Sequence, residues 1–254
     1  MLKTWVTRVA VTTMVTATVC TAAGVANAAP SANPTAPAAA PVDTNPNTNG
    51  TYVHHGVPRD GCRQVGYIGD SLSDQTLGAW MNLTQGLNLY NFNYRLNASI
   101  SRTITYAGTG SGAAAGSAAD VARQYKAAGV DCYVLAIGTN DAAQTNGNYK
   151  DIVSRIDTIM SIAGNAKVRW VMPETMLKPG WVPTQFNPRY SDANMAVFRQ
   201  ALLDSAKKYR NLTVDRWDLV DKNIVGFWLP DNVHMLDGRF FFASYIISSM
   251  LRAH

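Results

Sequence analysis

Charge is scarce in this sequence of 254 residues: only 15% of them are Asp, Glu, Lys or Arg, and the basic residues form no cluster. A basic patch is the usual mark of a nucleic-acid-binding protein, so we expect no nucleic-acid partner. Long apolar runs are also missing after about the first 25 residues, which excludes several membrane-spanning helices. Since 47% of the residues are hydrophobic, wholesale disorder is excluded too.

Histidine is almost as scarce. Of the four histidines, His54 and His55 adjoin the N-terminal segment and His254 is the last residue, which leaves His234 inside the expected folded region. An enzyme that needs a general base near neutral pH would therefore use His234. No group of residues has the spacing of metal ligands, so we expect no metal and no other cofactor.

The N-terminus predicts export. Lys3 and Arg8 precede a small, apolar, threonine-rich stretch that ends in Ala26-Asn27-Ala28, the pattern of a signal peptide over residues 1–28. Cleavage lowers the net charge from +5 to +3 and leaves no firm membrane anchor; an uncleaved anchor is the alternative. Residues 29–50, rich in Ala, Pro and Thr, predict a flexible tether, and residues 51–254 the folded domain.

Export leaves two cysteines, Cys62 and Cys132, in an oxidising compartment. Each lies shortly before an apolar run, and each run reaches a polar loop after nearly the same number of residues. If the two runs are neighbouring parallel strands, the two sulfurs lie close enough for a disulfide. The alternative is two buried free thiols.

Short strand-like runs alternate with helical ones from residue 63 onward, a pattern that predicts an α/β fold with a parallel sheet. One helix is indicated at 117–128 by a Ser cap and a Gly stop, and another at 239–251 by its apolar residues. Two more are indicated by apolar residues at helical spacing. The first has Ile152, Ile156, Ile159 and Ala163 on one face, and the second has Met195, Phe198, Leu202 and Ser205. The expected strands are residues 64–69, 100–106, 132–137, 167–172 and 212–217.

Polar segments follow these strands. They are Gly69-Asp70-Ser71-Leu72, Gly138-Thr139-Asn140-Asp141 and, near the C-terminus, Asp231-Asn232-Val233-His234. A serine hydroxyl becomes a good nucleophile when a histidine takes its proton and a carboxylate orients the imidazole, and Asp231 is three residues from His234. The order Ser, Asp, His is that of the α/β-hydrolases. However, their G-x-S-x-G elbow fails here because Ser73 replaces the second glycine.

The three segments together resemble the GDSL/SGNH hydrolases, and the resemblance covers about residues 61–252. It implies a flavodoxin-like three-layer sandwich with a five-stranded parallel sheet and a site at the carboxyl ends of the strands. Ser71 would be the nucleophile, His234 the base and Asp231 its orienting acid. The backbone N–H of Ser71, a glycine N–H and the Asn140 side chain would form the oxyanion hole.

The glycine of that oxyanion hole is where the sequence departs from the family. After the expected strand come Gly108, Gly110 and Gly112, of which Gly110 is our choice and the others are alternatives. The same stretch, Gly108-x-Gly110-x-x-Ala113, fits a relaxed dinucleotide fingerprint. That hypothesis needs an acidic residue at the end of the next strand, which instead ends in Ile137-Gly138.

Together with the predicted signal peptide, the resemblance leads us to predict a secreted serine esterase that forms an acyl-enzyme on Ser71 and acts on a small-molecule, lipid or glycan ester. We expect it to favour short acyl chains. An acyltransferase or O-deacetylase of cell-envelope glycans or glycolipids would use the same residues, and a catalytically silent binding domain is the alternative outside enzymes. Loops at 78–98 and 173–190 would set the acyl length.

Overall fold

The computed structural model describes residues 50–58, 61–76, 78–91, 93–175, 187–220 and 226–253. The predicted signal peptide and nearly all of the predicted tether lie outside these ranges, as does most of the loop at 173–190. The chain divides into two units, and every described residue belongs to the second, Ala40–His254. Within the described ranges, no helix is both long and apolar enough to cross a membrane.

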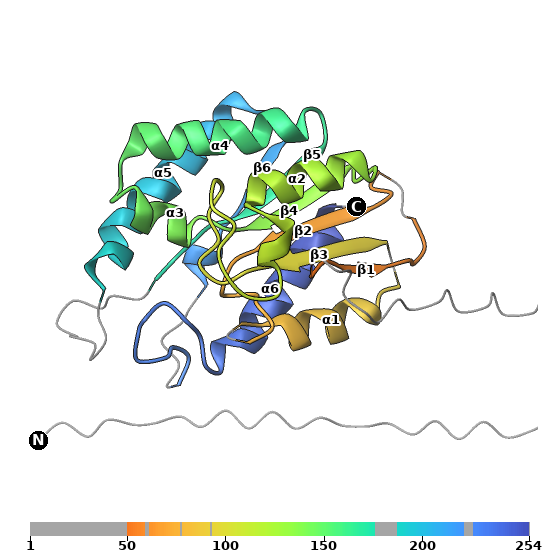
Figure 1. Ribbon diagram of the computed structural model, residues 1–254, viewed down its shortest axis with the longest axis horizontal. Coiled ribbons are helices and arrows are strands. Elements are labelled where there is room, and N and C mark those ends of the chain that lie inside the picture. The colour runs from red at the N-terminus through yellow and green to blue at the C-terminus, as the bar shows by residue number, and fades with distance from the viewer. Residues whose placement is uncertain are drawn as a thin grey trace, which may run out of the picture. The chain divides into compact units, whose positions relative to one another are not determined.

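The centre of the fold is a six-stranded sheet with the order β1-β3-β2-β4-β5-β6 (Figure 1). The five strands from β2 to β6 run parallel, as the sequence predicts, and β1 pairs antiparallel with β3 at one edge. The edge strand is the difference from the expected five-stranded sheet. The strands are β1 (Tyr52–His54), β2 (Val65–Gly69), β3 (Tyr94–Ala98), β4 (Cys132–Ala136), β5 (Lys167–Val171) and β6 (Leu212–Asp215).

The expected strand at 100–106 is wrong, because the strand at this place in the fold is β3, which ends at Ala98. Tyr94, Leu96 and Ala98 are all buried and pack in the core on one face of the sheet. The β-branched residues that follow form turns instead. Ile100 makes only an isolated bridge to Thr109, at hydrogen-bond distances of 2.8 and 2.9 Å.

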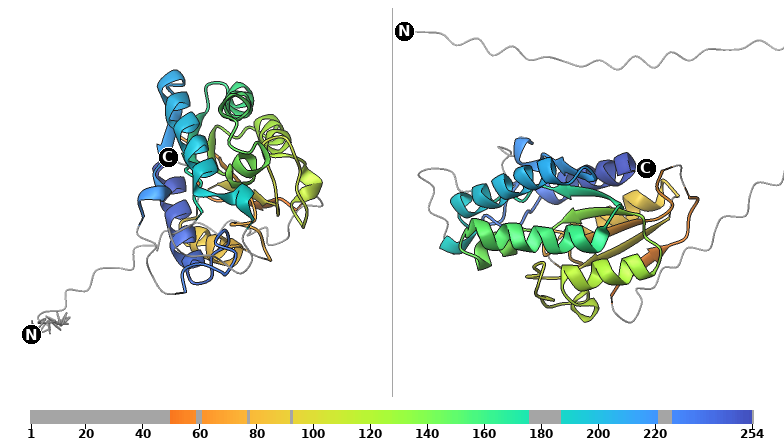
Figure 2. Two further views of the ribbon diagram at one scale, coloured as in Figure 1. Left: turned by 90° about the vertical axis from the view of Figure 1, so that its left-hand side faces the viewer. Right: turned by 90° about the horizontal axis from the view of Figure 1, so that it is seen from above.

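Helices cover both faces of the sheet (Figures 1 and 2). Helices α1 (Trp80–Asn88) and α6 (Gly238–Ala253) bury their apolar residues in the core on one face. On the other face lie α2 (Ala118–Ala127), α4 (Tyr149–Ala163) and α5 (Asp192–Lys208). The helices indicated by the sequence are confirmed, including the Ser117 cap and the buried faces of α4 and α5.

The strand order creates the crevice that holds the polar segments. From β2 the chain passes to β3 on one side, and it then crosses to β4 on the other side of β2. Open α/β sheets bind ligands where the order reverses in this way, outside the carboxyl ends of the strands. The register pairs Gly69 with Ala136, so β2 and β4 end level and the loops containing Ser71 and Asn140 start side by side.

Cys62 and Cys132 form a disulfide, with their Cα atoms 5.9 Å apart, so the predicted pairing is confirmed and the alternative of two free thiols is wrong. Cys132 is the first residue of β4 and pairs in register with Val65 at the start of β2. The bond therefore joins the amino ends of the two strands whose carboxyl ends hold Ser71 and Asn140.

We expect the Cys62→Ala/Cys132→Ala variant to lose about 4 kcal/mol of unfolding free energy, because the bond closes a loop of 70 residues in the unfolded chain. Urea unfolding of the variant, and of the wild type with and without a reductant, measures this loss. An unchanged urea midpoint in the reduced wild type would contradict the prediction.

Candidate active site

Ser71 lies in a tight turn directly after β2. The carboxylate Oδ1 of Asp70 accepts the Leu72 N–H at 3.0 Å, which closes the turn. Gly69 permits a close approach, because a Cβ there would lie 2.8 Å from the side chain of Ser73. Ser73 itself is buried and hydrogen-bonded to the hydroxyl of Tyr67. The turn thus fixes Ser71 at the carboxyl edge of the sheet.

Asp231 and His234 belong to a second tight turn, which precedes α6. An antiparallel bridge between Trp228 and Met235 and a 2.8 Å bond from the Leu229 N–H to the His234 carbonyl close the turn. Asn232 takes the left-handed conformation with a φ of 57°, which asparagine tolerates better than most residues. The buried side chain of Met235 anchors the turn in the core.

The structure brings Ser71, His234 and Asp231 together. The Nε2 of His234 lies 2.9 Å from the Ser71 Oγ, and its Nδ1 lies 2.6 Å from the Asp231 Oδ2. The other oxygen of Asp231 accepts the backbone N–H groups of Val233 and His234 at 3.0 and 2.9 Å. This is the geometry in which an imidazole can take the proton of a serine hydroxyl.

The electrostatics of Asp231 suit an orienting carboxylate. Burial raises the pKa of Asp231, but the hydrogen bonds that it accepts from the His234 ring and from the two backbone N–H groups outweigh burial and lower the pKa overall. A carboxylate that stays ionised favours the imidazolium that forms when His234 takes a proton.

Asn140 lies near the start of α3 (Thr139–Gln144), directly after β4. Its Nδ2 donates to the Arg102 carbonyl at 3.2 Å, and its Oδ1 accepts from the Tyr190 hydroxyl at 2.8 Å. Because a carbonyl only accepts, the contact with Arg102 fixes which end of the amide carries the nitrogen. One Nδ2–H is used by Arg102, so the second N–H is left to donate to a developing oxyanion.

The three glycines pack closely against neighbouring parts of the chain. A Cβ on Gly110 would face Asp74 and Ile100, and Cβ atoms on Gly108 and Gly112 would meet the carbonyls of Ile100 and Ala98. The role of Gly110 as an oxyanion donor stays a prediction. Its selection relied on a strand ending at residue 106, whereas β3 ends at Ala98.

Arg102 is the residue that the sequence analysis missed. It is fully buried, its Nη1 and Nη2 donate to the carbonyls of Gly69 and Gly112 at 3.4 and 2.6 Å, and its own carbonyl accepts from Asn140. Burial lowers the pKa of Arg102 to about 10, which keeps it protonated at neutral pH. Its signal in the sequence is a single arginine between Ser101 and Thr103, in a chain that has few charges.

Asp141 supports the same loop from the other side. Its carboxylate accepts the Ile104 N–H at 3.1 Å and pairs with the Arg155 Nη1 at 2.8 Å. Burial raises the pKa of Asp141 to about 6, although Arg155 opposes that effect. Asn140 and Asp141 thus both bind the loop that follows β3.

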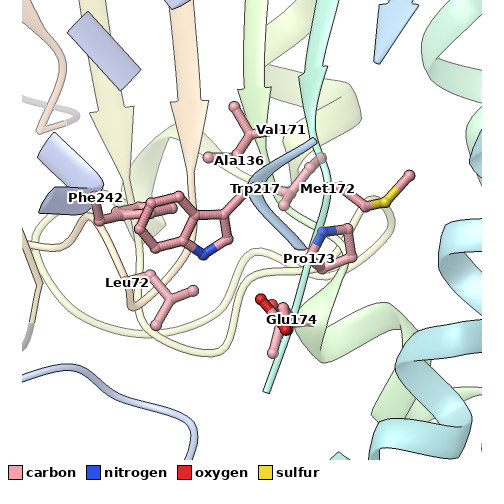
Figure 3. A pocket seen from close by; sticks show the side chains of 10 residues that line it. Leu72, Ala136, Val171, Met172, Pro173, Glu174, Trp217 and Phe242 are labelled. Carbon is pink, nitrogen blue, oxygen red and sulfur yellow. The ribbon is translucent and has the colours of Figure 1, made fainter. Parts of the chain in front are cut away.

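A narrow pocket, lined mainly by apolar side chains and also by Glu174, lies at the carboxyl ends of β4 and β5 (Figure 3). Leu72 and Thr139, the neighbours of Ser71 and Asn140, belong to its lining. Trp217 and Phe242 form an apolar wall with ring centres 5.1 Å apart. The cavity volume is about 10 Å³, which is room for about one water molecule.

Among the described residues, the group of His, Cys, Asp and Glu side chains close enough to share a metal ion consists of Cys62, Asp131 and Cys132. The two sulfurs are bonded to each other, so neither is a thiolate ligand. The dinucleotide hypothesis finds no support either, because β3 ends at Ala98, well before Gly108, and the 3₁₀ turn Ala113–Ala115 separates the glycines from the start of α2 at Ala118.

No family model matches the sequence, and no curated protein matches it. Solved structures do match. A lipase/acylhydrolase from Enterococcus faecalis is 14% identical, with a TM-score of 0.55 over 74% of this chain and 95% of that one. A carbohydrate acetylesterase from Sinorhizobium meliloti is also 14% identical, with a TM-score of 0.52 over 75% of this chain and 99% of that one. These likenesses show that the chain shares the α/β fold of those two proteins, with helices on both faces of a mainly parallel sheet.

Asp70 gives the folded state a pH dependence that can be measured. Burial raises its pKa from 3.8 to about 7, so the folded protein holds this proton more tightly than the unfolded chain does. The unfolding free energy therefore falls as the pH rises from about 4 to about 7. We expect Asp70→Asn to be more stable than wild type by up to about 4 kcal/mol above pH 8 and to differ little below pH 4.

Urea unfolding of both proteins across pH 4 to 9 checks this prediction, and the measurement at pH 4 is the internal control. A stability difference that is the same at every pH would contradict it.

Proposed function

We propose that this protein is a secreted serine esterase that hydrolyses carboxylic esters with short acyl chains. The observation that carries the proposal is the aligned series of two contacts, 2.9 Å from Ser71 to His234 and 2.6 Å from His234 to Asp231. Hydrolysis of esters is also what the names of the two structural neighbours imply for those proteins. The disulfide supports export, because disulfides persist in oxidising compartments.

The chemistry would run in two steps. The His234 Nε2 takes the proton of Ser71 while the Oγ attacks the ester carbonyl, and the proton then passes to the leaving alcohol as the ester C–O bond breaks. The acyl group remains on Ser71. Water, deprotonated by the same imidazole, then attacks the acyl-enzyme and releases the acid, and Ser71 regains its proton.

The oxyanion of each tetrahedral intermediate would be bound by the backbone N–H of Ser71 and by the free Nδ2–H of Asn140. Within the described part of the chain, no carbonyl or side chain accepts the Ser71 N–H. A donor that has no partner in the resting protein is available for the charge that develops in the transition state. Removing one such donor typically lowers kcat by about 10²- to 10³-fold.

The preference for short acyl chains is supported by the narrow pocket next to Leu72. A space that holds about one water molecule also suits the methyl group of an acetate. A longer chain would have to displace Trp217 or Phe242, and overpacking of that kind costs about 1–3 kcal/mol.

We expect kcat/KM to fall from p-nitrophenyl acetate to butyrate to octanoate, with octanoate about tenfold or more below acetate, the equivalent of about 1.4 kcal/mol.

Ser71→Ala should reduce kcat about 10⁶-fold. Ser154→Ala, an exposed serine on α4, is the matched control and should keep full activity. Turnover by Ser71→Ala at the wild-type rate would refute the assignment. A folded wild type with no turnover would favour the silent binding domain.

Tyr190 should act as a positioning residue, because its hydroxyl holds the Asn140 carboxamide at 2.8 Å. Losing one hydrogen bond of this kind costs about 1 kcal/mol, so Tyr190→Phe should lower kcat about fivefold and change KM little. Tyr209→Phe removes a similar bond, the one to Asp157, and is the matched control. If both variants keep the wild-type kcat, the hydroxyl of Tyr190 does not position Asn140.

A further inference from the structure

The guanidinium of Arg102 is fully buried and binds the backbone rather than a carboxylate. Its Nη1 and Nη2 donate to the carbonyls of Gly69 and Gly112 at 3.4 and 2.6 Å, and among the described residues it forms no ion pair. Arg169, by contrast, is paired with the carboxylate of Asp215. The side chain of Arg102 therefore joins two backbone segments, the end of β2 and residues 108–112.

Packing alone does not call for a charge at this position. Replacing buried ionic groups by apolar residues of similar size is often neutral or stabilising, because a buried charge loses its hydration. Burial lowers the pKa of Arg102 to about 10, so the charged form is less stable here than in water. The contacts of Arg102 therefore indicate a role beyond the stability of the fold.

The backbone of Arg102 holds the side chain of Asn140. The Arg102 carbonyl accepts from the Asn140 Nδ2 at 3.2 Å, which leaves one Nδ2–H for an oxyanion. Asn140 also lines a second, wider pocket of about 210 Å³ together with Tyr106 and Tyr190, so it borders space that a substrate can enter. The direction of the remaining N–H depends on where the Arg102 carbonyl lies.

The guanidinium fixes the place of that carbonyl relative to β2. Its bond to the Gly69 carbonyl ties residue 102 to the strand that ends two residues before Ser71, and its bond to Gly112 holds the other end of the same loop. The turn that contains Ser71 has a closing bond of its own, which does not involve Arg102. The side chain of Arg102 therefore acts on Asn140 more directly than on Ser71.

We propose that Arg102 is a positioning residue that directs the Nδ2–H of Asn140 at the oxyanion through its own backbone carbonyl. The inference rests on the proposed esterase function and adds to it a residue that does not touch the substrate. Its effect belongs to the transition state, because the ester oxygen gains negative charge only there. Loss of the guanidinium should therefore lower kcat and leave KM nearly unchanged.

The first test measures kcat and KM for p-nitrophenyl acetate in two variants with long side chains. Arg102→Met has no donor and should lower kcat about 30-fold, somewhat less than the loss of an oxyanion donor does. Arg102→Lys reaches one carbonyl at a time and should lower kcat about fivefold. KM should change by less than about twofold in both. Arg169→Met, which removes another arginine that is largely buried, is the matched control and should keep the wild-type kcat. A wild-type kcat in Arg102→Met would overturn the proposal.

A double-mutant cycle with Asn140→Ala separates positioning from general damage to the fold. If Arg102 acts through Asn140, Arg102→Met should lower kcat by less than about threefold once Asn140 is already replaced. An equal loss with and without Asn140 would show that Arg102 supports only the fold, and it would contradict the inference.

Hydrogen exchange tests the same coupling without turnover and without an Arg102 variant. Asn140→Ala removes the group that binds the Arg102 carbonyl. Because a coupling acts in both directions, the guanidinium N–H groups of Arg102, followed by NMR, should exchange with water about fivefold faster in Asn140→Ala than in wild type. The buried Trp170 indole N–H should keep its rate. Equal guanidinium rates would overturn the inference even if esters are hydrolysed. A wild type that hydrolyses no ester but shows this difference would refute the proposed function and leave the coupling of Arg102 to Asn140 established.

Discussion

The buried guanidinium of Arg102 joins the segments from which the site is built. It binds the carbonyl of Gly69, two residues before Ser71, and the carbonyl of Gly112, while the Arg102 backbone binds Asn140. A buried cation is costly unless its donors are paired, so moving either carbonyl away would leave more of this buried charge without a partner. The position of Ser71 relative to Asn140 therefore depends on one side chain that need not contact the substrate.

Much of the fold could be predicted because its signals are local. The apolar runs of β2, β4, β5 and β6 are short and bounded by polar loops, and the Ser117 cap fixes the start of α2. The expected strand at 100–106 is wrong because it, too, rests on local signals alone. Ile100 and Ile104 have the residue type of a strand, whereas pairing with β2 selects Tyr94–Ala98, whose alternating residues fill the core. Propensity is decided locally, but register is decided by the neighbouring strand.

The candidate site also has parts that the sequence predicts and parts that it does not. Ser71, Asp231 and His234 could be predicted because histidine is scarce and because the Asp-x-x-His spacing is short enough to act within one turn. The orientation of Asn140 could not be predicted, because it depends on Tyr190, which is 50 residues away, and on a carbonyl of the loop after β3. The identity of the reactive residues can thus be predicted from short sequence segments. The orientation of their side chains depends on contacts that form only when the chain folds.

Two pockets of different size extend this argument to specificity. An ester has two halves, and the carbonyl carbon between them must lie at the Ser71 Oγ with its oxygen at the hydrogen-bond donors. The narrow space beside Leu72 accepts one half only if it is small, and the wider space at Tyr106 leaves room for the other half to be large. Reversing the ester would force the larger half into the narrow space, where it would have to displace Trp217 or Phe242. The difference in size between the two pockets would therefore set the direction in which the ester binds, with the acyl group in the narrow space and the alcohol in the wide one.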